Sequence, residues 1–440
     1  MLDLRSLLLH APLPDKRLRT RAQRMVQSLL RGHSSTSLGM LAPADCTPES
    51  FTRGSYRFLD NDSVQLPALQ SPLSQALAQL VPPSQRAFVV HDLSVLNFSG
   101  HQAKQDLIPV GNERTFGYEL YQALVLSSDG KPLGSAVTEL RNTQGIHSSQ
   151  SPQVLPFTDH LEQTERAVDT VEAQLPGREL VHLCDREFDD LKLLRHLGAR
   201  KYVIRAQHLR RRVRVHGEEC LLQQHLAGVP LSLCGEVLRP EEGKTERYEL
   251  YIGQTRVTMY GPSLRGVAKG RSRPEPGEAL SVRVVISELR QQGRKPLRWV
   301  LLTNLADPSR SVVQAYLGRW KIERLFWLTK LGFRLEQWHQ ESALRIARRL
   351  LLVQLAALMI YQLMQPGEAD AHEWTQRLAR LGGWSGRQRS PIGPTVLMRG
   401  ALIFLAAVQL CQQLGSSELL SMARSLEPLL GPILRREGEL

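Results

Sequence analysis

The sequence predicts a mixed α/β protein in which a β-rich insertion divides the main fold and helical regions flank it. Residues 1–80 have the polar composition and the periodicity of surface helices. From residue 86, short apolar runs between turn residues predict strands, and alternating patterns continue through residues 207–299. After residue 300 the pattern returns to helix. The chain has 440 residues, which is enough for two or more domains, because single cores stop growing near about 250–300 residues.

The chain divides where these patterns change. The expected segments are a helical N-terminal domain (1–80), the first part of an α/β core (81–206), the β-rich insertion (207–299), the second part of the core (300–365) and a helical C-terminal region (366–440). The polar stretch 365–374 (QPGEADAHEW) predicts a linker ahead of the last helices.

Cations are concentrated in the N-terminal domain. The cations concerned are Arg17, Arg21, Arg24, Arg53 and Arg57, and Tyr56 lies among them in sequence. Each arginine taken singly is explained by an ordinary solvated charge, but their density favours a helical module that faces DNA.

The charge balance of the whole chain indicates a polyanionic partner. Lys and Arg number 56 against 43 Asp and Glu, which gives a net charge of +13 and a pI near 9.8. We expect no membrane partner, because the most apolar windows, 350–364 and 401–411, are too short or too interrupted by Gln to span a bilayer, and they predict buried helices. We find no secretory signal, and five cysteines without a C-x2-C pair favour a reducing compartment, so we expect a cytoplasmic protein.

Two aspartates follow apolar strand-like runs. Asp92 comes after AFVVH, and Asp185 comes after ELVHLC. Carboxylates at the ends of adjacent strands can converge on a cation, for which oxygen ligands are suited. Two alternatives stay open: Asp92 is a turn residue that caps the next segment, and Asp185 is a helix N-cap. A zinc site from His91, His101, His182 and Cys184 fits no standard spacing.

The stretch 316–330 (YLGRWKIERLFWLTK) carries four functional side chains in a Y-x2-R-x3-E-x6-K pattern. On one α-helix, Tyr316, Arg319, Glu323 and Lys330 fall at roughly 0°, 300°, 340° and 320° and share a narrow face. A solvated stripe with an ordinary ion pair is the alternative. Two tryptophans beside this face argue against that alternative and favour a site for a metal or a phosphate.

Together, HDLSVL around Asp92, LCDRE around Asp185 and the Tyr316 to Lys330 pattern resemble the DDE transposases of bacterial insertion sequences, in the subgroup with that Tyr-Arg-Glu-Lys signature. The resemblance extends to GSYRFLDN, VIRAQH and PLRWVLLTN, and it covers most of residues 10–365. It implies a ribonuclease-H-like catalytic core with a β-rich insertion between the second aspartate and the glutamate. Where such proteins often have hydroxyl residues directly after the first aspartate, this chain has Leu93 and then Ser94.

The resemblance also implies roles for single residues. Asp92, Asp185 and Glu323 become the catalytic triad and the ligands of two Mg²⁺ ions, for which Mn²⁺ can substitute. The implied DNA contacts are Tyr316, Arg319, Lys330, Trp299, Arg205, Arg210, Arg57, Tyr56, Arg53, Arg17 and Arg21. Trp299 matches the position at which the family stacks a flipped base, and a core tryptophan is the alternative.

The expected function is that of a nucleoid-associated bacterial transposase that binds terminal inverted repeats and performs Mg²⁺-dependent cleavage, through a hairpin, and strand transfer into target DNA. The resemblance implies a homodimer in the synaptic complex, which the C-terminal helices support. Two alternatives remain: a domesticated or decayed DNA-binding protein without catalysis, and a ribonuclease-H-like nuclease without strand transfer.

Overall fold

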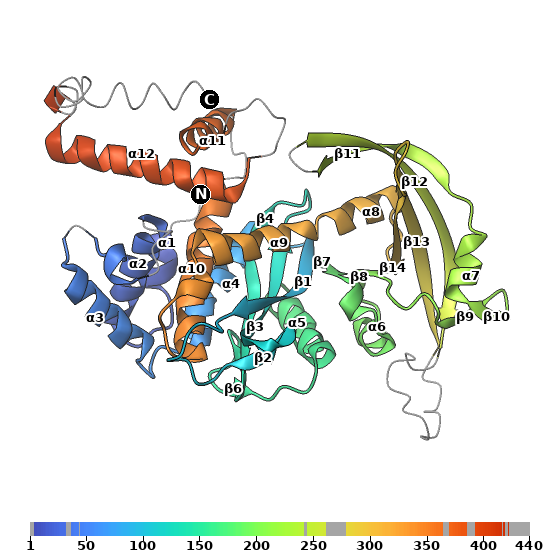
Figure 1. Ribbon diagram of the computed structural model, residues 1–440, viewed down its shortest axis with the longest axis horizontal. Coiled ribbons are helices and arrows are strands. Elements are labelled where there is room, and N and C mark those ends of the chain that lie inside the picture. Colours follow the sequence, from blue (N-terminus) through green and yellow to red (C-terminus); the bar gives the residue numbers. More distant parts are fainter. Residues whose placement is uncertain are drawn as a thin grey trace. The chain divides into compact units, whose positions relative to one another are not determined.

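The computed structural model describes residues 4–31, 37–43, 45–241, 244–260, 279–363, 369–384, 392–415, 417–418 and 421. The chain separates into two compact units, Met1–Gln362 and Leu363–Leu440. The first unit combines helices with one large mixed sheet, so the expected mixed α/β class is confirmed (Figure 1).

The N-terminal region is helical, as expected. Its elements are α1 (Leu4–Leu9), α2 (Lys16–Arg31), the short 3₁₀ helix η1 (Gly39–Leu41), α3 (Pro48–Leu59) and α4 (Leu66–Leu80). Helix α3 begins where Thr47 accepts a hydrogen bond from the Ser50 backbone N–H (3.2 Å) and Pro48 takes the first helical position. Helices α2 and α3 pack closely because Gly54 leaves room for Arg21, whose guanidinium would lie within 2.5 Å of an added Cβ.

The central sheet begins with a meander of antiparallel strands. Strands β1 (Arg86–Asn97), β3 (Asn112–Leu126) and β4 (Pro132–Asn142) pair in that order, and β2 (Ile108–Val110), β5 (Gly145–Ser148) and β6 (Val154–Leu155) are short additions. Strand β7 (Glu179–Cys184) pairs parallel to β1, and β8 (Lys201–Arg205) pairs parallel to β7. Helices α5 (His160–Gln174) and η2 (Arg186–Phe188) with α6 (Leu191–Leu197) make the parallel connections.

The expected insertion is rich in strands and extends the same sheet. Its elements are β9 (Arg212–Val215), β10 (Glu218–Leu221), α7 (Leu222–Ala227), β11 (Ser232–Glu241), β12 (Lys244–Met259) and β13 (Leu280–Arg290). Strand β14 (Leu297–Thr303) then pairs with both β13 and β8, which joins the insertion to the central strands. In Figure 1, α1 to α3 lie at one end of this unit and the insertion strands lie at the other.

The stretch 316–330 is not one regular α-helix, so that prediction was wrong in detail. Helix α8 (Ser309–Leu317) ends, α9 (Trp320–Trp327) follows, and Leu328–Gly332 forms a π-helical turn. Gly318 and Arg319 join α8 to α9 in helical conformation, and the backbone N–H groups of Arg319 and Lys321 bond three residues back instead of four. The chain continues through η4 (Leu335–Gln337) into α10 (Ala343–Leu363).

The second unit contains α11 (Ala369–Leu381) and α12 (Pro394–Leu414). The two helices approach closely at Gly400, where an added Cβ would lie 1.7 Å from the Leu378 carbonyl oxygen. Helix α11 begins at Ala369, so the linker expected over 365–374 is helical in its second half.

The apolar windows differ in burial. Residues 350–358 and 360–362 of the first window are buried, as expected. Ile403 and Phe404 of the second window are exposed, so the expectation of a buried helix was wrong for these two residues. None of the helices in the described residues is long and apolar enough to cross a membrane.

Candidate active site

Asp92 lies inside β1 and does not end it, contrary to the sequence prediction. Strand β1 continues to Asn97 because its antiparallel pairing with β3 runs on to Asn97 and Gly117. The parallel pairing with β7 stops one residue before Asp92, at His91 and Cys184. The Asp92 side chain is therefore found where one neighbouring strand has ended, and it does not cap a turn.

Asp185 directly follows β7, as predicted. Its Oδ1 accepts a hydrogen bond from the Arg186 backbone N–H (2.7 Å), so it is also the N-cap of η2. The parallel register places Asp185 next to Asp92 at the same position along the two strands. Both interpretations of this residue, helix cap and site carboxylate, are thus compatible with its position.

Glu323 joins the two aspartates through Arg319. The Arg319 Nη1 donates to Asp92 Oδ2 at 2.8 Å, and its Nη2 donates to Glu323 Oε1 at 3.0 Å. The same Nη2 lies 3.7 Å from Asp185 Oδ2. We call Asp92, Asp185 and Glu323 the carboxylate cluster, because one guanidinium links a side chain of β1, the residue that follows β7 and a side chain of α9.

The sequence predicts that Arg319 contacts DNA, but the structure places its side chain in the interior. Its side chain is 6% exposed. Burial by itself would lower the pKa of its guanidinium, but Asp185 and Asp92 raise that pKa above its ordinary value. Arg319 is therefore a buried cation that is held by the carboxylate cluster.

The carboxylate of Asp92 is unusually easy to protonate. Burial raises its pKa to about 6, although Arg319 and the Leu93 backbone N–H favour the ionised form. The neighbouring charges of Asp185 and Glu323 add to the rise. The raised pKa of Asp92 thus results mainly from the burial of its carboxylate, with a smaller contribution from the two neighbouring carboxylates.

Tyr316 and Arg205 also contact the cluster. The Tyr316 hydroxyl donates to Asp185 Oδ1 at 3.0 Å, and Arg205 Nη1 lies 3.7 Å from the same oxygen. Tyr316 is buried, so its hydroxyl orients Asp185 in this structure. The half-buried Trp299 of β14 meets the Tyr316 ring edge-on, with 6.2 Å between the ring centroids. Trp299 is therefore not the fully buried core residue of the alternative interpretation.

Lys330, the last residue of the pattern, lies farther from the cluster. Its Nζ donates to the Val95 carbonyl oxygen and lies 3.9 Å from Glu336 Oε1. Burial lowers the pKa of its ammonium group. The π-helical turn places Lys330 beside the end of β1, where it is half-buried.

The histidines whose spacing fits no standard zinc site have protein partners. Hydrogen bonds join His91 Nδ1 to the Tyr121 hydroxyl (2.7 Å), His91 Nε2 to His182 Nδ1 (2.9 Å) and His182 Nε2 to Glu172 (3.1 Å). His101 bonds to the Glu336 carbonyl oxygen instead. Because both ring nitrogens of His91 and His182 are already bonded, these two rings form a structural chain through the core.

The carboxylate cluster has the donor atoms for a divalent cation of the Mg²⁺ or Mn²⁺ type. Within the described residues, no three His, Cys, Asp or Glu side chains are placed to hold a metal as they stand. Arg319 lies between the three carboxylates. Gln122, which pairs with Asp92 across β1 and β3, is buried, and its amide has no hydrogen-bond partner. A buried amide of this kind fits an additional polar species, such as the water shell of a bound ion.

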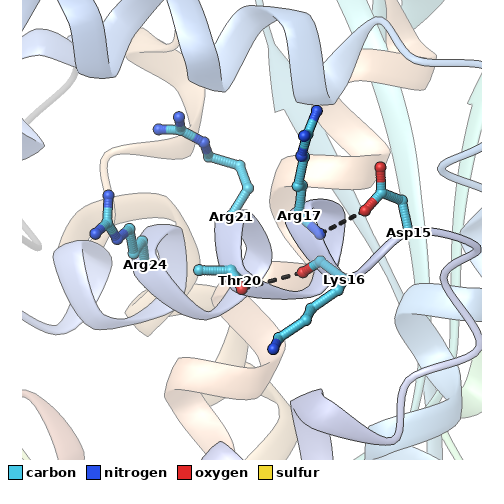
Figure 2. A pocket seen from close by; sticks show the side chains of 6 residues that line it. All are labelled: Asp15, Lys16, Arg17, Thr20, Arg21 and Arg24. Atoms are coloured by element: carbon cyan, nitrogen blue, oxygen red, sulfur yellow. Dashed lines mark hydrogen bonds between the residues drawn. The ribbon is translucent and has the colours of Figure 1, made fainter.

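The N-terminal cations form a separate group. Lys16, Arg17, Arg21 and Arg24 line a cavity of about 450 Å³ on α2, together with Asp15 and Thr20. Figure 2 shows Arg17 and Arg21 pointing to the same side of α2. We call these four cations the α2 cation cluster. Lys16 was not predicted as a site residue, although it precedes Arg17 in sequence and belongs to the same charged run.

The other predicted DNA contacts lie on further elements. Arg53 and Arg57 of α3 are exposed, and Tyr56 between them is half-buried. Arg210 is exposed after β8. Its neighbour Arg211, part of the same basic run, is buried in an ion pair with Asp189 (2.5 Å) and is not on the surface.

Comparison with known proteins gave no match, either among protein-family models or among curated proteins.

Proposed function

We propose that this chain is a DDE-type DNA transposase, a metal-dependent enzyme that cuts the ends of an insertion sequence and joins them to target DNA. The observation that carries the proposal is the carboxylate cluster. Three carboxylates far apart in sequence, Asp92, Asp185 and Glu323, meet around one guanidinium. Such a concentration of negative charge is costly unless cations bind it, which argues for a site whose ligand is a cation.

Asp92, Asp185 and Glu323 would hold the Mg²⁺ or Mn²⁺ ions. When bound, a pair of such ions activates a water or a 3′ hydroxyl for attack at phosphorus and stabilises the leaving oxygen. The exposed fraction of the Glu323 side chain is 43%, which gives ions and DNA a way in from the side of α9.

Protein side chains around the cluster would position the DNA strand. Tyr316 holds the Asp185 carboxylate in place, and Arg205 lies on the same side. Arg319 and Lys330 would bind phosphates of the transposon end through charge-assisted hydrogen bonds. Trp299, half-buried beside Tyr316, would stack an unpaired base during hairpin formation, worth about 1–3 kcal/mol.

The N-terminal helices would bind the terminal inverted repeat. The exposed members of the α2 cation cluster, together with the exposed Arg53 and Arg57, would supply phosphate contacts on consecutive helices. Arg21, which was also predicted to contact DNA, is half-buried against α3 and would position these helices instead. Arg210 would continue the track beyond β8. The net charge of +13 agrees with a polyanionic partner.

The core is proposed to be ribonuclease-H-like. The adjacency of β1 and β7, with α9 beside them and the insertion strands between Asp185 and Glu323, supports this proposal. We further propose that the protein acts in the bacterial cytoplasm, at the nucleoid, as a homodimer in which each site acts on the DNA end bound mainly by the partner.

The test is cleavage of a labelled duplex that carries the element's terminal repeat, with Mg²⁺ or Mn²⁺. Wild type is expected to give nicks, hairpins and joined products. Glu323→Gln and Asp185→Asn are expected to bind the duplex and leave it uncut, whereas Arg324→Gln, a charge change on the same helix, keeps the activity within a few-fold. Binding without any cleavage by wild type would favour a non-catalytic DNA-binding protein, and nicks without joined products would favour a nuclease.

A further inference from the structure

Arg319 occupies the position at which the carboxylate cluster would bind metal. Its two terminal nitrogens reach Asp92 Oδ2 (2.8 Å), Glu323 Oε1 (3.0 Å) and Asp185 Oδ2 (3.7 Å). Its Nε is also buried and has no hydrogen-bond partner. The polar contacts that the structure describes for this side chain are therefore all with the carboxylates, at its outer end.

A metal ion and this guanidinium compete for the same oxygens. Mg²⁺ binds carboxylate oxygen at about 2.0–2.1 Å and needs the lone pairs that now accept from Arg319. A guanidinium that stayed in place would also repel the incoming ion. Metal binding to this arrangement thus requires the Arg319 side chain to leave the cluster.

The backbone around Arg319 allows such a movement. Arg319 sits between α8 and α9 with ordinary helical dihedral angles, φ −52° and ψ −35°. Its backbone is therefore not strained in either position of the side chain, and the movement that the proposal needs is a rotation about the side-chain bonds. A phosphate of bound DNA can accept the hydrogen bonds that the carboxylates give up.

We propose that Arg319 is an internal counter-ion that fills the metal site until DNA binds, and that its release couples metal binding to phosphate binding. The inference rests on the proposed function and deepens it. DNA that captures the guanidinium frees the carboxylates for metal, and metal that displaces the guanidinium frees it for DNA. By linkage, each ligand tightens the other by the same factor.

Two consequences follow for the protein without DNA. Wild type binds Mn²⁺ weakly, because the ion must displace Arg319. Arg319→Gln leaves three carboxylates without their shared cation and is expected to bind Mn²⁺ at least about 10-fold more tightly than wild type. In wild type, DNA tightens Mn²⁺ binding by a similar factor, and in Arg319→Gln that effect is lost.

The experiment is Mn²⁺ titration of the full chain, followed by the paramagnetic resonance signal of the free ion. The titration is run without DNA and with a pre-cleaved terminal-repeat duplex. The last nucleotide of this duplex lacks its 3′ hydroxyl, so that no joining reaction can occur. Arg324→Gln is the matched control, since it removes one charge from the same helix, and among the described ion pairs none joins Arg324 to the cluster. Its Mn²⁺ affinity is expected to stay within about 2-fold of wild type. Arg319→Lys keeps a positive charge on a shorter side chain, and its Mn²⁺ affinity should lie between those of wild type and Arg319→Gln. It replaces Arg319→Gln in the experiment if that variant does not fold.

The outcomes separate the two proposals. Mn²⁺ binding that Asp185→Asn abolishes, with equal or weaker affinity in Arg319→Gln, would overturn the counter-ion role and leave the transposase proposal standing. Absence of any Mn²⁺ binding that depends on Asp185, with and without DNA, would overturn both. Tighter binding in Arg319→Gln together with loss of the DNA effect would establish the coupling.

Discussion

The carboxylate cluster and the α2 cation cluster use arginine in opposite ways. Arg319 is buried and held by three carboxylates, whereas Arg17 and Arg24 are exposed on a surface helix. Arg24 lies 3.6 Å from Asp45, but both side chains are largely exposed, so the pair contributes little. One region thus holds a positive charge inside the fold, and the other carries its positive charges on the surface. A cluster of arginines along the sequence indicates the exposed kind, whereas nothing in the sequence distinguishes a single buried arginine such as Arg319.

The adjacent residues Arg210 and Arg211 give the largest expected difference. Arg211→Gln breaks a buried pair with Asp189, whose side chain is fully buried, and should lower the free energy of unfolding by about 3–5 kcal/mol. Arg210→Gln, on the surface, should change it by less than about 0.5 kcal/mol. Urea denaturation of both variants measures the change in the free energy of unfolding. Equal changes in the two variants would contradict the assignment of Arg211 as buried and Arg210 as exposed.

Asp92→Asn tests the charge of the buried region. The pKa of Asp92 in the folded protein is about 6, above its ordinary 3.8, so the folded state binds this proton more tightly than the unfolded state. Its contribution to stability is therefore full below about pH 4 and is lost as the pH rises through 6. In metal-free protein, the free energy of unfolding of Asp92→Asn should exceed that of wild type by up to about 3 kcal/mol at pH 7.5 and by almost nothing at pH 3. Denaturant unfolding over a pH series measures this difference. If the difference in the free energy of unfolding between Asp92→Asn and wild type did not change with pH, the raised pKa of Asp92 would be contradicted.

The α2 cation cluster should govern affinity for DNA and leave folding unchanged. In the triple variant Lys16→Gln, Arg17→Gln and Arg24→Gln, we expect roughly 10²-fold weaker binding to duplex DNA at low salt. The slope of log affinity against log salt should fall by about 3, one for each lost phosphate contact. Filter binding over a salt series measures both. An unchanged slope would show that this cluster does not meet phosphates.

Tyr316→Phe should have the smallest effect. It removes one hydrogen bond to Asp185, while Arg319 and Arg205 still lie near that carboxylate. We expect a loss of about 1 kcal/mol in the free energy of unfolding. A loss above about 3 kcal/mol in thermal melts would mean that the hydroxyl, and not Arg319, holds the cluster together.

Several features of the fold followed from local pattern. The strand containing Asp92, the strand before Asp185 and the helical ends were predictable because apolar periodicity reports burial directly. The end of β1 was misplaced, since it depends on pairing with β3, a contact between distant residues. The break at Gly318 and the π-helical turn after Trp327 also escaped prediction, because helical periodicity does not register a shift in hydrogen bonding.

The candidate site was predictable as a set of residues and not as an arrangement. The pattern at Tyr316 to Lys330 selected four polar side chains, but it could not show that Arg319 turns toward the aspartates while Lys330 bonds to β1. That information belongs to the packing of α9 on the sheet. Gln122 could not be predicted as a site residue from the sequence. Its place beside the cluster depends on the pairing of β1 with β3, which sets it opposite Asp92.

The long separation between the members of the carboxylate cluster sets the order in which the site is completed during synthesis. Asp92 and Asp185 are joined by β1 and β7, which can pair once the first half of the chain has emerged. Glu323 and Arg319 arrive only after the insertion strands. Contacts between such distant residues form late, because the intervening loop must close first. A chain that ends before residue 319 would therefore carry two facing aspartates without Arg319 and Glu323, and its carboxylate cluster would be incomplete.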